Sequence, residues 1–224
     1  MPLVMLDLND TLIGSNRPDG FVLSKDDYYF LDGAFDALAL WRREGWDIAI
    51  VTNQPGHHRF PDLISEDGMR ALMDHMVSGF RFVIGGDVGM YACYHDATLC
   101  DRCDGKGFTM SADSFDPETY RCTTCGGFGS FGCDCRKPRP GLIRQAMADY
   151  QCDGKDAVMV GDKWSDIMAA DLADVPGILV GSFSYETRGS QMPRDVPLPK
   201  LWVPDVWQAA ILTVAQSRLG DPKS

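Results

Sequence analysis

The sequence predicts an α/β protein built on a Rossmann-like, doubly wound parallel sheet. Short continuous apolar segments alternate with segments of helical periodicity, which is the pattern of crossover units in a parallel sheet. The apolar segments lack the alternation of strands with one exposed face, so both faces of the sheet are expected to be covered. Apolar residues make up 45% of the 224 residues, enough for one ordinary core.

The expected strands are short apolar runs that end in polar or glycine-containing turns. The first run, Val4–Asp7, leads into a turn-like Asn-Asp pair, and Trp46–Thr52 is a continuous apolar segment. Because these runs are short and bounded by turn residues, we interpret them as buried strands. The strands are expected at residues 4–7, 46–52, within 80–94, at 157–161 and at 177–181.

Helices are predicted where apolar residues recur every three or four positions. Ala34, Leu38 and Trp41 share one face of the first such segment, and Gly45 ends it. Ser65 is a favoured N-cap residue for the second. The helices are expected at residues 33–44, 65–78, 141–150, 165–172 and 203–218, with polar loop at 183–199.

A cysteine-rich insertion is expected to interrupt the core. Residues 1–92 and 136–224 form the predicted α/β core, and residues 93–135 form an insertion rich in Cys, Gly and Asp. Seven of the eight cysteines fall in that segment. We expect no export signal, so clustered Cys-x-x-Cys pairs favour metal ligands over disulfides.

Charge and hydropathy narrow the classes of partner. The chain has 21 basic and 32 acidic residues, a net charge of −11, which disfavours nucleic acid as a partner but leaves a local basic site open. The apolar runs are shorter than the ~20 residues of a membrane helix. We therefore expect a cytoplasmic protein without a membrane segment; its oligomeric state is not predicted.

Four short segments carry polar side chains at the expected ends of strands. In chain order they supply a carboxylate, a hydroxyl group, a cation and an acid pair. Phosphoryl transfer needs a nucleophile, positioning and neutralisation of the phosphate charge. Because ligands of parallel sheets bind beyond the carboxyl ends of the strands, we expect the segments to meet there. They are Leu6–Leu12, Val51–Gln54, Cys135–Pro138 and Val160–Asp166.

Together, these segments resemble the motifs of the haloacid dehalogenase-like (HAD) phosphatase superfamily. The chain is most similar to the branch of heptose-1,7-bisphosphate 7-phosphatases and histidinol-phosphate phosphatases, which implies a small or absent cap. The similarity runs from about residue 2 to about residue 181, interrupted by the insertion. It includes the markers Cys93-Tyr94-His95 and Cys133–Gly141.

The resemblance implies a role for each catalytic side chain. Asp7 corresponds to the nucleophile that forms an aspartyl-phosphate. Thr52 and Asn53 correspond to groups that hold the phosphoryl oxygens, and Lys137 to the cation that neutralises them. Arg136 corresponds to an arginine that contacts the rest of the substrate, a small phosphorylated molecule.

The resemblance also implies a Mg²⁺ site. Asp162 would bind the ion together with the Asp7 carboxylate and the backbone carbonyl of Asn9. Asp166, one helical turn further on, would contact it indirectly. Mg²⁺ uses few protein carboxylates and keeps water and phosphate ligands, which suits this sparse set.

Residue 9 departs from the family pattern. The family has a second aspartate there, which protonates the leaving oxygen and then activates water, whereas this chain has Asn9. An amide does not exchange protons near neutral pH, so we expect reduced activity. Asn9 is either an introduced change or a natural feature of a slow enzyme or a phosphate binder. Leu8 and Asp10 replace residues that are commonly Arg and Gly in this branch, so its substrates do not transfer directly.

Two structural zinc sites are predicted. The first resembles the zinc loop of the family, and the second is a repeat of Cys-x-x-Cys-x-Gly-x-Gly that resembles the zinc hairpins of DnaJ-type chaperones. A redox-active Cys-x-x-Cys pair is the alternative for the second. The ligands are Cys93, His95, Cys133 and Cys135 for the first site, and Cys100, Cys103, Cys122 and Cys125 for the second.

The leading hypothesis is a Mg²⁺-dependent phosphatase of a small, sugar-phosphate-like metabolite, limited by Asn9. One alternative keeps the reaction but takes a nucleotide or a nucleic-acid terminal phosphate. Another is a non-catalytic protein that binds a phosphorylated ligand or a partner through its zinc loops.

Overall fold

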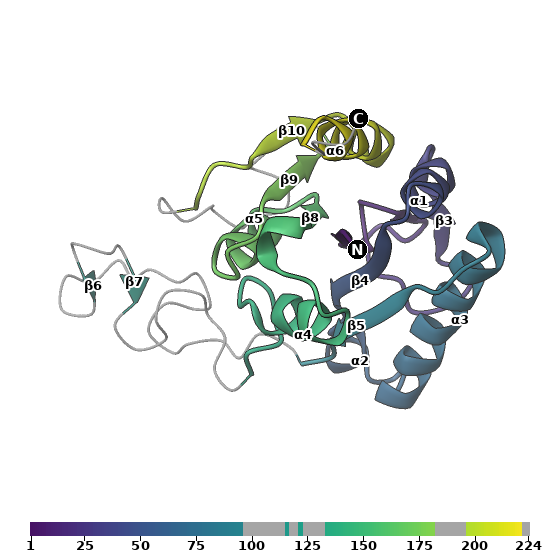
Figure 1. Cartoon of the computed structure of the whole chain (residues 1–224). Coiled ribbons are helices and arrows are strands. Elements are labelled where there is room, and N and C mark those ends of the chain that lie inside the picture. The colour runs from purple at the N-terminus through teal and green to yellow at the C-terminus, as the bar shows by residue number, and fades with distance from the viewer. Residues whose placement is uncertain (96–114, 117–120, 123–132, 182–195, 221–224) are drawn as a thin grey trace.

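A parallel sheet of six strands, in the order β10-β9-β8-β1-β4-β5, forms the centre of the protein (Figure 1). The computed structural model describes residues 1–95, 115–116, 121–122, 133–181 and 196–220. The strands of this sheet are β1 Leu3–Leu6, β4 Asp47–Asn53, β5 Gly89–Cys93, β8 Ala157–Gly161, β9 Gly177–Val180 and β10 Leu201–Val203.

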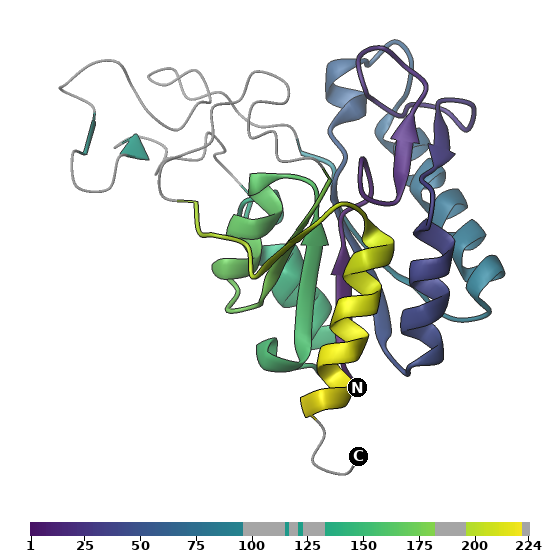
Figure 2. The same cartoon turned by 90° about the horizontal axis from the view of Figure 1, so that it is seen from above.

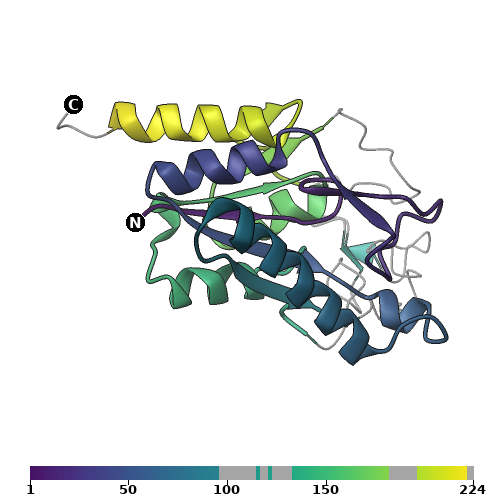
Figure 3. The same cartoon turned by 90° about the vertical axis from the view of Figure 1, so that its right-hand side faces the viewer.

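Helices cover both faces of this sheet, as the continuous apolar strands predict (Figures 1 and 3). Along β1, Val4 and Leu6 pack into the core shared with α1, α3 and α6, while Leu3 and Met5 pack against α4 and α5. The doubly wound α/β fold is therefore confirmed. The helices are α1 Ala34–Arg43, α2 Gly56–Arg59, α3 Glu66–Ile84, α4 Gly141–Asp149, α5 Trp164–Asp171 and α6 Val206–Gly220.

Two small antiparallel pairs stand outside this sheet. The hairpin of β2 (Ile13–Ser15) and β3 (Tyr28–Phe30) follows directly after β1. It lies at the end of the sheet opposite the N-terminus, where the parallel strands end (Figure 2). The other pair, β6 (Phe115–Asp116) and β7 (Arg121–Cys122), belongs to the cysteine-rich segment.

The structure corrects two expected boundaries. Helix α3 continues to Ile84 rather than ending at residue 78, because Phe80 is fully buried and Gly85 supplies the left-handed C-cap. The segment before α6 contains the strand β10, so the helix begins at Val206 rather than residue 203. The β2–β3 hairpin was not predicted.

No helix in the described part of the chain combines the length and the apolarity needed to cross a membrane.

We expect the contact between α1 and α6 to be a sensitive point of the fold. The indole N–H of Trp41 donates to the hydroxyl of Thr213 at 2.9 Å, and both side chains are buried. Thr213→Val removes the acceptor and leaves a buried donor unpaired, so the free energy of unfolding should fall by about 1–3 kcal/mol. Urea titration measures it. Thr213→Ser retains the hydroxyl and is the matched control; an equal loss in both variants would contradict the role of the hydrogen bond.

Candidate active site

The four predicted segments converge on one pocket of about 340 Å³. Strands β1, β4 and β8 are neighbours in the sheet, so the residues that follow them meet at one edge. The hairpin and the segment before α4 complete the walls. Of the side chains predicted from the sequence, the pocket is lined by Asp7, Asn9, Thr52, Asn53, Arg136, Lys137 and Asp166.

The buried ammonium group of Lys137 bridges two carboxylates at the centre of this pocket. The Nζ of Lys137 lies 2.8 Å from Oδ1 of Asp7 and 2.6 Å from Oδ1 of Asp166, and it donates to the carbonyl of Val51 at 2.6 Å. All three charged residues are at most 5% exposed. Buried charges are stable only when they are paired in this way. The structure therefore brings the predicted nucleophile and the predicted cation into direct contact.

These contacts shift the ionisation of the two predicted reactive groups. Burial by itself would raise the pKa of Asp7, but Lys137 and Lys163 outweigh it and lower the pKa, so the carboxylate is ionised. Burial would likewise lower the pKa of Lys137, and Asp166 and Asp7 raise it instead. An ionised carboxylate is the form that can act as a nucleophile.

A third carboxylate, Asp162, leaves the centre with excess negative charge. Oxygens of Asp7, Asp162 and Asp166 lie within 4.8 Å of one another. Burial, with the nearby carboxylates, raises the pKa of Asp162 to about 8, although Lys163 at 2.9 Å opposes this. Mg²⁺ is bound by one or two carboxylates together with water and phosphate, so this donor set fits the predicted ion.

The amide of Asn53 fixes the segment that carries Lys137. Its Nδ2 donates to the Lys137 carbonyl and its Oδ1 accepts from the Lys137 N–H, both at 3.0 Å. In the same segment, the guanidinium of Arg136 donates to the His95 carbonyl at 2.8 Å. These two side chains line the pocket, but the contacts shown for them are internal; their predicted substrate contacts stay predictions.

Gln54 is a site residue for which no role was predicted. Its buried amide nitrogen donates to Oδ1 of Asn9 at 2.7 Å and to the Thr52 hydroxyl oxygen at 3.0 Å. Both contacted groups act as acceptors toward Gln54, so the hydroxyl hydrogen of Thr52 and the amide hydrogens of Asn9 remain for other acceptors. In the sequence, the available signal for a site role was the place of Gln54 in the second polar segment, two residues after Thr52.

The first predicted zinc site is brought together. The sulfur of Cys135 lies 3.1 Å from the sulfur of Cys93 and 3.2 Å from Nδ1 of His95. The sulfur of Cys93 lies 3.6 Å from Nδ1 of His95 and 3.9 Å from the sulfur of Cys133. A tetrahedral zinc shell places neighbouring N and S ligand atoms roughly 3.3–3.8 Å apart, so the donor set fits zinc.

The second predicted zinc site lies outside the part of the chain whose side chains are described. Cys100, Cys103 and Cys125 fall in residues that the structure does not describe, and only the backbone of Cys122 is described, in β7.

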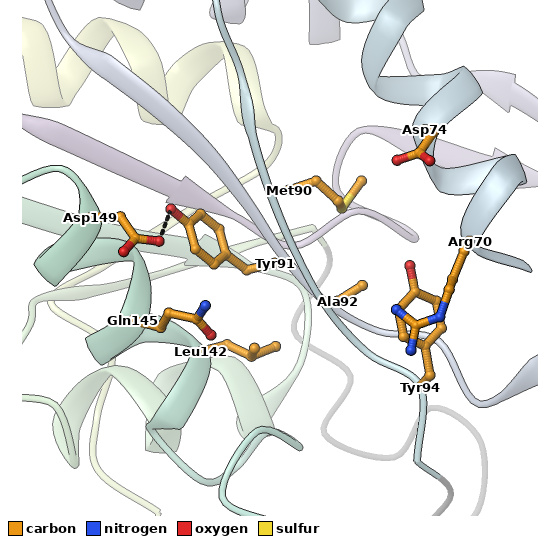
Figure 4. A pocket seen from close by; sticks show the side chains of 9 residues that line it. All are labelled: Arg70, Asp74, Met90, Tyr91, Ala92, Tyr94, Leu142, Gln145 and Asp149. Carbon is orange, nitrogen blue, oxygen red and sulfur yellow. Dashed lines mark hydrogen bonds between the residues drawn. The ribbon is translucent and has the colours of Figure 1, made fainter. Parts of the chain in front are cut away.

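A second hollow, of about 500 Å³, lies along the edge strand β5 between α3 and α4 (Figure 4). There the Tyr91 hydroxyl donates to Asp149 at 3.0 Å, and the guanidinium of Arg70 lies 4.2 Å from the ring centroid of Tyr94. Although it is the larger hollow, none of the predicted catalytic or metal-binding residues lines it. The smaller pocket at the carboxyl ends of the strands is therefore the candidate active site.

Comparisons with known proteins identify the family of the chain. A family model described as HAD-hydrolase-like matches residues 134–209. The D-glycero-beta-D-manno-heptose-1,7-bisphosphate 7-phosphatase of Vibrio cholerae is 32% identical over 178 residues, covering 78% of this chain and 77% of that protein. The enzyme of the same name from Pasteurella multocida is 31% identical and covers 77% of each chain.

Solved structures share the fold. The D,D-heptose 1,7-bisphosphate phosphatase from B. bronchiseptica, complexed with magnesium and phosphate, matches with a TM-score of 0.67 at 23% identity, covering 96% of this chain and 99% of that chain. A putative HAD-like phosphatase from Mesorhizobium loti matches with a TM-score of 0.64 at 19% identity, covering 100% and 90%. The chain belongs to the HAD family of phosphatases, the class of phosphoric monoester hydrolases.

Removing the central cation should destabilise the folded protein strongly. Lys137→Met leaves two buried carboxylates without their partner, and breaking a buried ion pair from one side costs about 3–5 kcal/mol. We expect a loss of that size in the free energy of unfolding, measured by urea titration without added metal. The exposed Lys155→Met is the matched control and should change it by less than about 1 kcal/mol. Equal effects of the two substitutions would refute the buried network as the cause.

Proposed function

We propose that the chain is a Mg²⁺-dependent phosphatase that forms an aspartyl-phosphate on Asp7 and acts on a small, sugar-phosphate-like metabolite. The observation that carries the proposal is the position of the Asp7 carboxylate, which lines the pocket while Lys137 holds it and Asp162 and Asp166 lie beside it. The relatives reported above are named for the hydrolysis of a sugar bisphosphate, which supports this substrate class.

In the proposed reaction, an Asp7 oxygen attacks phosphorus, and the bond from phosphorus to the leaving oxygen breaks. Lys137 keeps Asp7 ionised and offsets the negative charge that gathers around the phosphoryl group. The Thr52 hydroxyl donates to a phosphoryl oxygen, since Gln54 occupies it only as an acceptor. Mg²⁺, held by Asp7 and Asp162, supplies further charge neutralisation when bound. Water then cleaves the aspartyl-phosphate and releases phosphate.

Asn9 limits both steps of this proposal. The leaving oxygen must gain a proton, and the attacking water must lose one; an amide can do neither near neutral pH. Asn9 can still hydrogen-bond, because Gln54 fixes its oxygen and leaves its N–H groups available. The chain as it stands is therefore proposed to bind phosphomonoesters well and to turn them over slowly.

We expect Asn9→Asp to raise the steady-state rate of phosphomonoester hydrolysis with Mg²⁺ by about 10²–10⁴-fold, the usual contribution of a general acid/base. A screen of sugar phosphates, with a nucleoside monophosphate included for the alternative substrate class, measures this by phosphate release. Asp7→Asn in the same background is the control and should abolish the gain. Equal rates for the native chain and the Asn9→Asp variant would remove residue 9 from the mechanism.

The intermediate itself gives a second readout of the same prediction. With p-nitrophenyl phosphate, the leaving group needs little protonation, so the native chain with Asn9 should release a burst of p-nitrophenol equal to the enzyme concentration. Mass spectrometry should then find the added phosphate on the peptide that contains Asp7.

We also propose that the chain binds two structural zinc ions. The first would be held by Cys93, His95, Cys133 and Cys135. Neighbouring donor atoms of this set lie 3.1–3.9 Å apart, close enough to share one ion. Its role would be to fix the segment of Lys137, since Cys135 is two residues away and Arg136 binds the His95 carbonyl. The second would be held by the repeated Cys-x-x-Cys pairs, as the sequence predicts.

Metal analysis of protein purified without chelators should give two zinc ions per chain. Cys135→Ser should remove one and also weaken orthophosphate binding, because the loop that carries Lys137 loses its anchor. The half-buried Cys152→Ser lies outside both clusters and should keep both ions. Unstripped protein that contains no zinc would contradict both sites.

A further inference from the structure

Asp10 occupies an unusual backbone position at the mouth of the pocket. Its φ is +62°, in the left-handed region where residues other than Gly are uncommon and Asp and Asn are best tolerated. Its N–H donates to the Ile13 carbonyl at 2.7 Å, which holds the turn after β1. The turn therefore places a carboxylate among the residues that line the pocket, where a glycine would place none.

The Asp10 carboxylate lies close to the half-exposed ammonium group of Lys163. Oδ2 of Asp10 lies 3.7 Å from Nζ of Lys163, which also lies 2.9 Å from Asp162 and 3.9 Å from Asp7. Three carboxylates thus surround one ammonium group. Asp10 is the most exposed of the three acids, so its carboxylate is the one that a group entering the pocket would meet beside Lys163.

The other cations of the pocket also have partners. Lys137 is shared between two buried carboxylates, and the Arg136 guanidinium is held by a backbone carbonyl. The Arg59 guanidinium lies 5.4 Å from the ring centroid of Phe21. Near Lys163, the pocket presents the carboxylate of Asp10.

We propose that Asp10 determines specificity by excluding substrates with a second phosphate, so that the site takes monophosphates whose remaining part is uncharged. The inference rests on the proposed function and refines its substrate class. A second phosphate that reached toward Lys163 would meet the Asp10 carboxylate, and close like charges disfavour binding. A neutral polyol part would instead find carboxylate and amide hydrogen-bond partners.

Equilibrium binding to the native chain with Mg²⁺ tests this, because slow turnover leaves the ligand intact. The probes are orthophosphate, the monophosphate of 1,3-propanediol and its bisphosphate, which lack stereochemistry. The native chain should bind the monophosphate more tightly than the bisphosphate. Asp10→Asn keeps the side-chain shape and the turn but removes the charge, so it should shift the ratio about tenfold toward the bisphosphate.

Matched variants separate the local effect from net charge. Asp26→Asn makes the same change in net charge at an exposed position that does not line the pocket, and it should leave the ratio unchanged. Adding Lys163→Met to Asp10→Asn should cancel the gain in bisphosphate binding. The ammonium group of Lys163, which Asp10→Asn leaves without this carboxylate, is then absent.

The outcomes distinguish this inference from the proposed function. If the native chain prefers the bisphosphate, or if Asp10→Asn leaves the ratio unchanged, the inference is overturned while the phosphatase proposal stands. If orthophosphate and both esters fail to bind the native chain with Mg²⁺, the proposed function fails and the inference fails with it.

Discussion

The ammonium group of Lys137 is the contact on which the candidate site depends. It joins Asp7 from the first strand to Asp166 from α5 and is itself tied to the carbonyl of Val51 in β4. Taking three charges out of water is unfavourable, and the network offsets this only because every partner is in place. Two features hold the segment of Lys137 in place: the amide of Asn53 hydrogen-bonds its backbone, and Cys135, the last member of the Cys/His cluster, lies two residues before it.

A consequence of this network is that the acids of the site outnumber the lysines that pair with them. Lys137 is shared by two carboxylates, and Lys163 lies among three carboxylates, one of which is Asp7 again. The imbalance around Asp162 is of the kind that a divalent ion relieves. The excess of acids also affects which substrates would bind, because each carboxylate near the rim would repel a ligand that carries additional negative charge. The proposed metal requirement and the proposed charge selectivity would thus have one origin in the count of acids and bases.

The sequence predicted those elements that leave a pattern in neighbouring residues, such as apolar runs and clustered cysteines. Strand runs such as that ending at Asp7 could be predicted directly, since buried parallel strands are continuous apolar segments. The cluster around Cys93 was predicted from its resemblance to the zinc loop of the family. The β2–β3 hairpin and β10 were missed because three-residue strands are too short to show periodicity. The contacts of Gln54 and Asp10 were missed because each depends on a side chain far away in the sequence or on a backbone turn.

The hydrogen bonds of Gln54 determine what the Asn9 site can do chemically. Its NH₂ group has two hydrogens and uses one on Thr52 and one on Asn9, so both of those groups accept at this contact. Each then has hydrogens left for another acceptor, and the group that would accept them is a phosphoryl oxygen. An aspartate at position 9 would accept the same bond from Gln54 with one oxygen and keep the other for a proton. In the proposed mechanism, the same scaffold would thus support proton transfer with Asp and hydrogen-bond donation with Asn, because Gln54 would orient residue 9 in both cases.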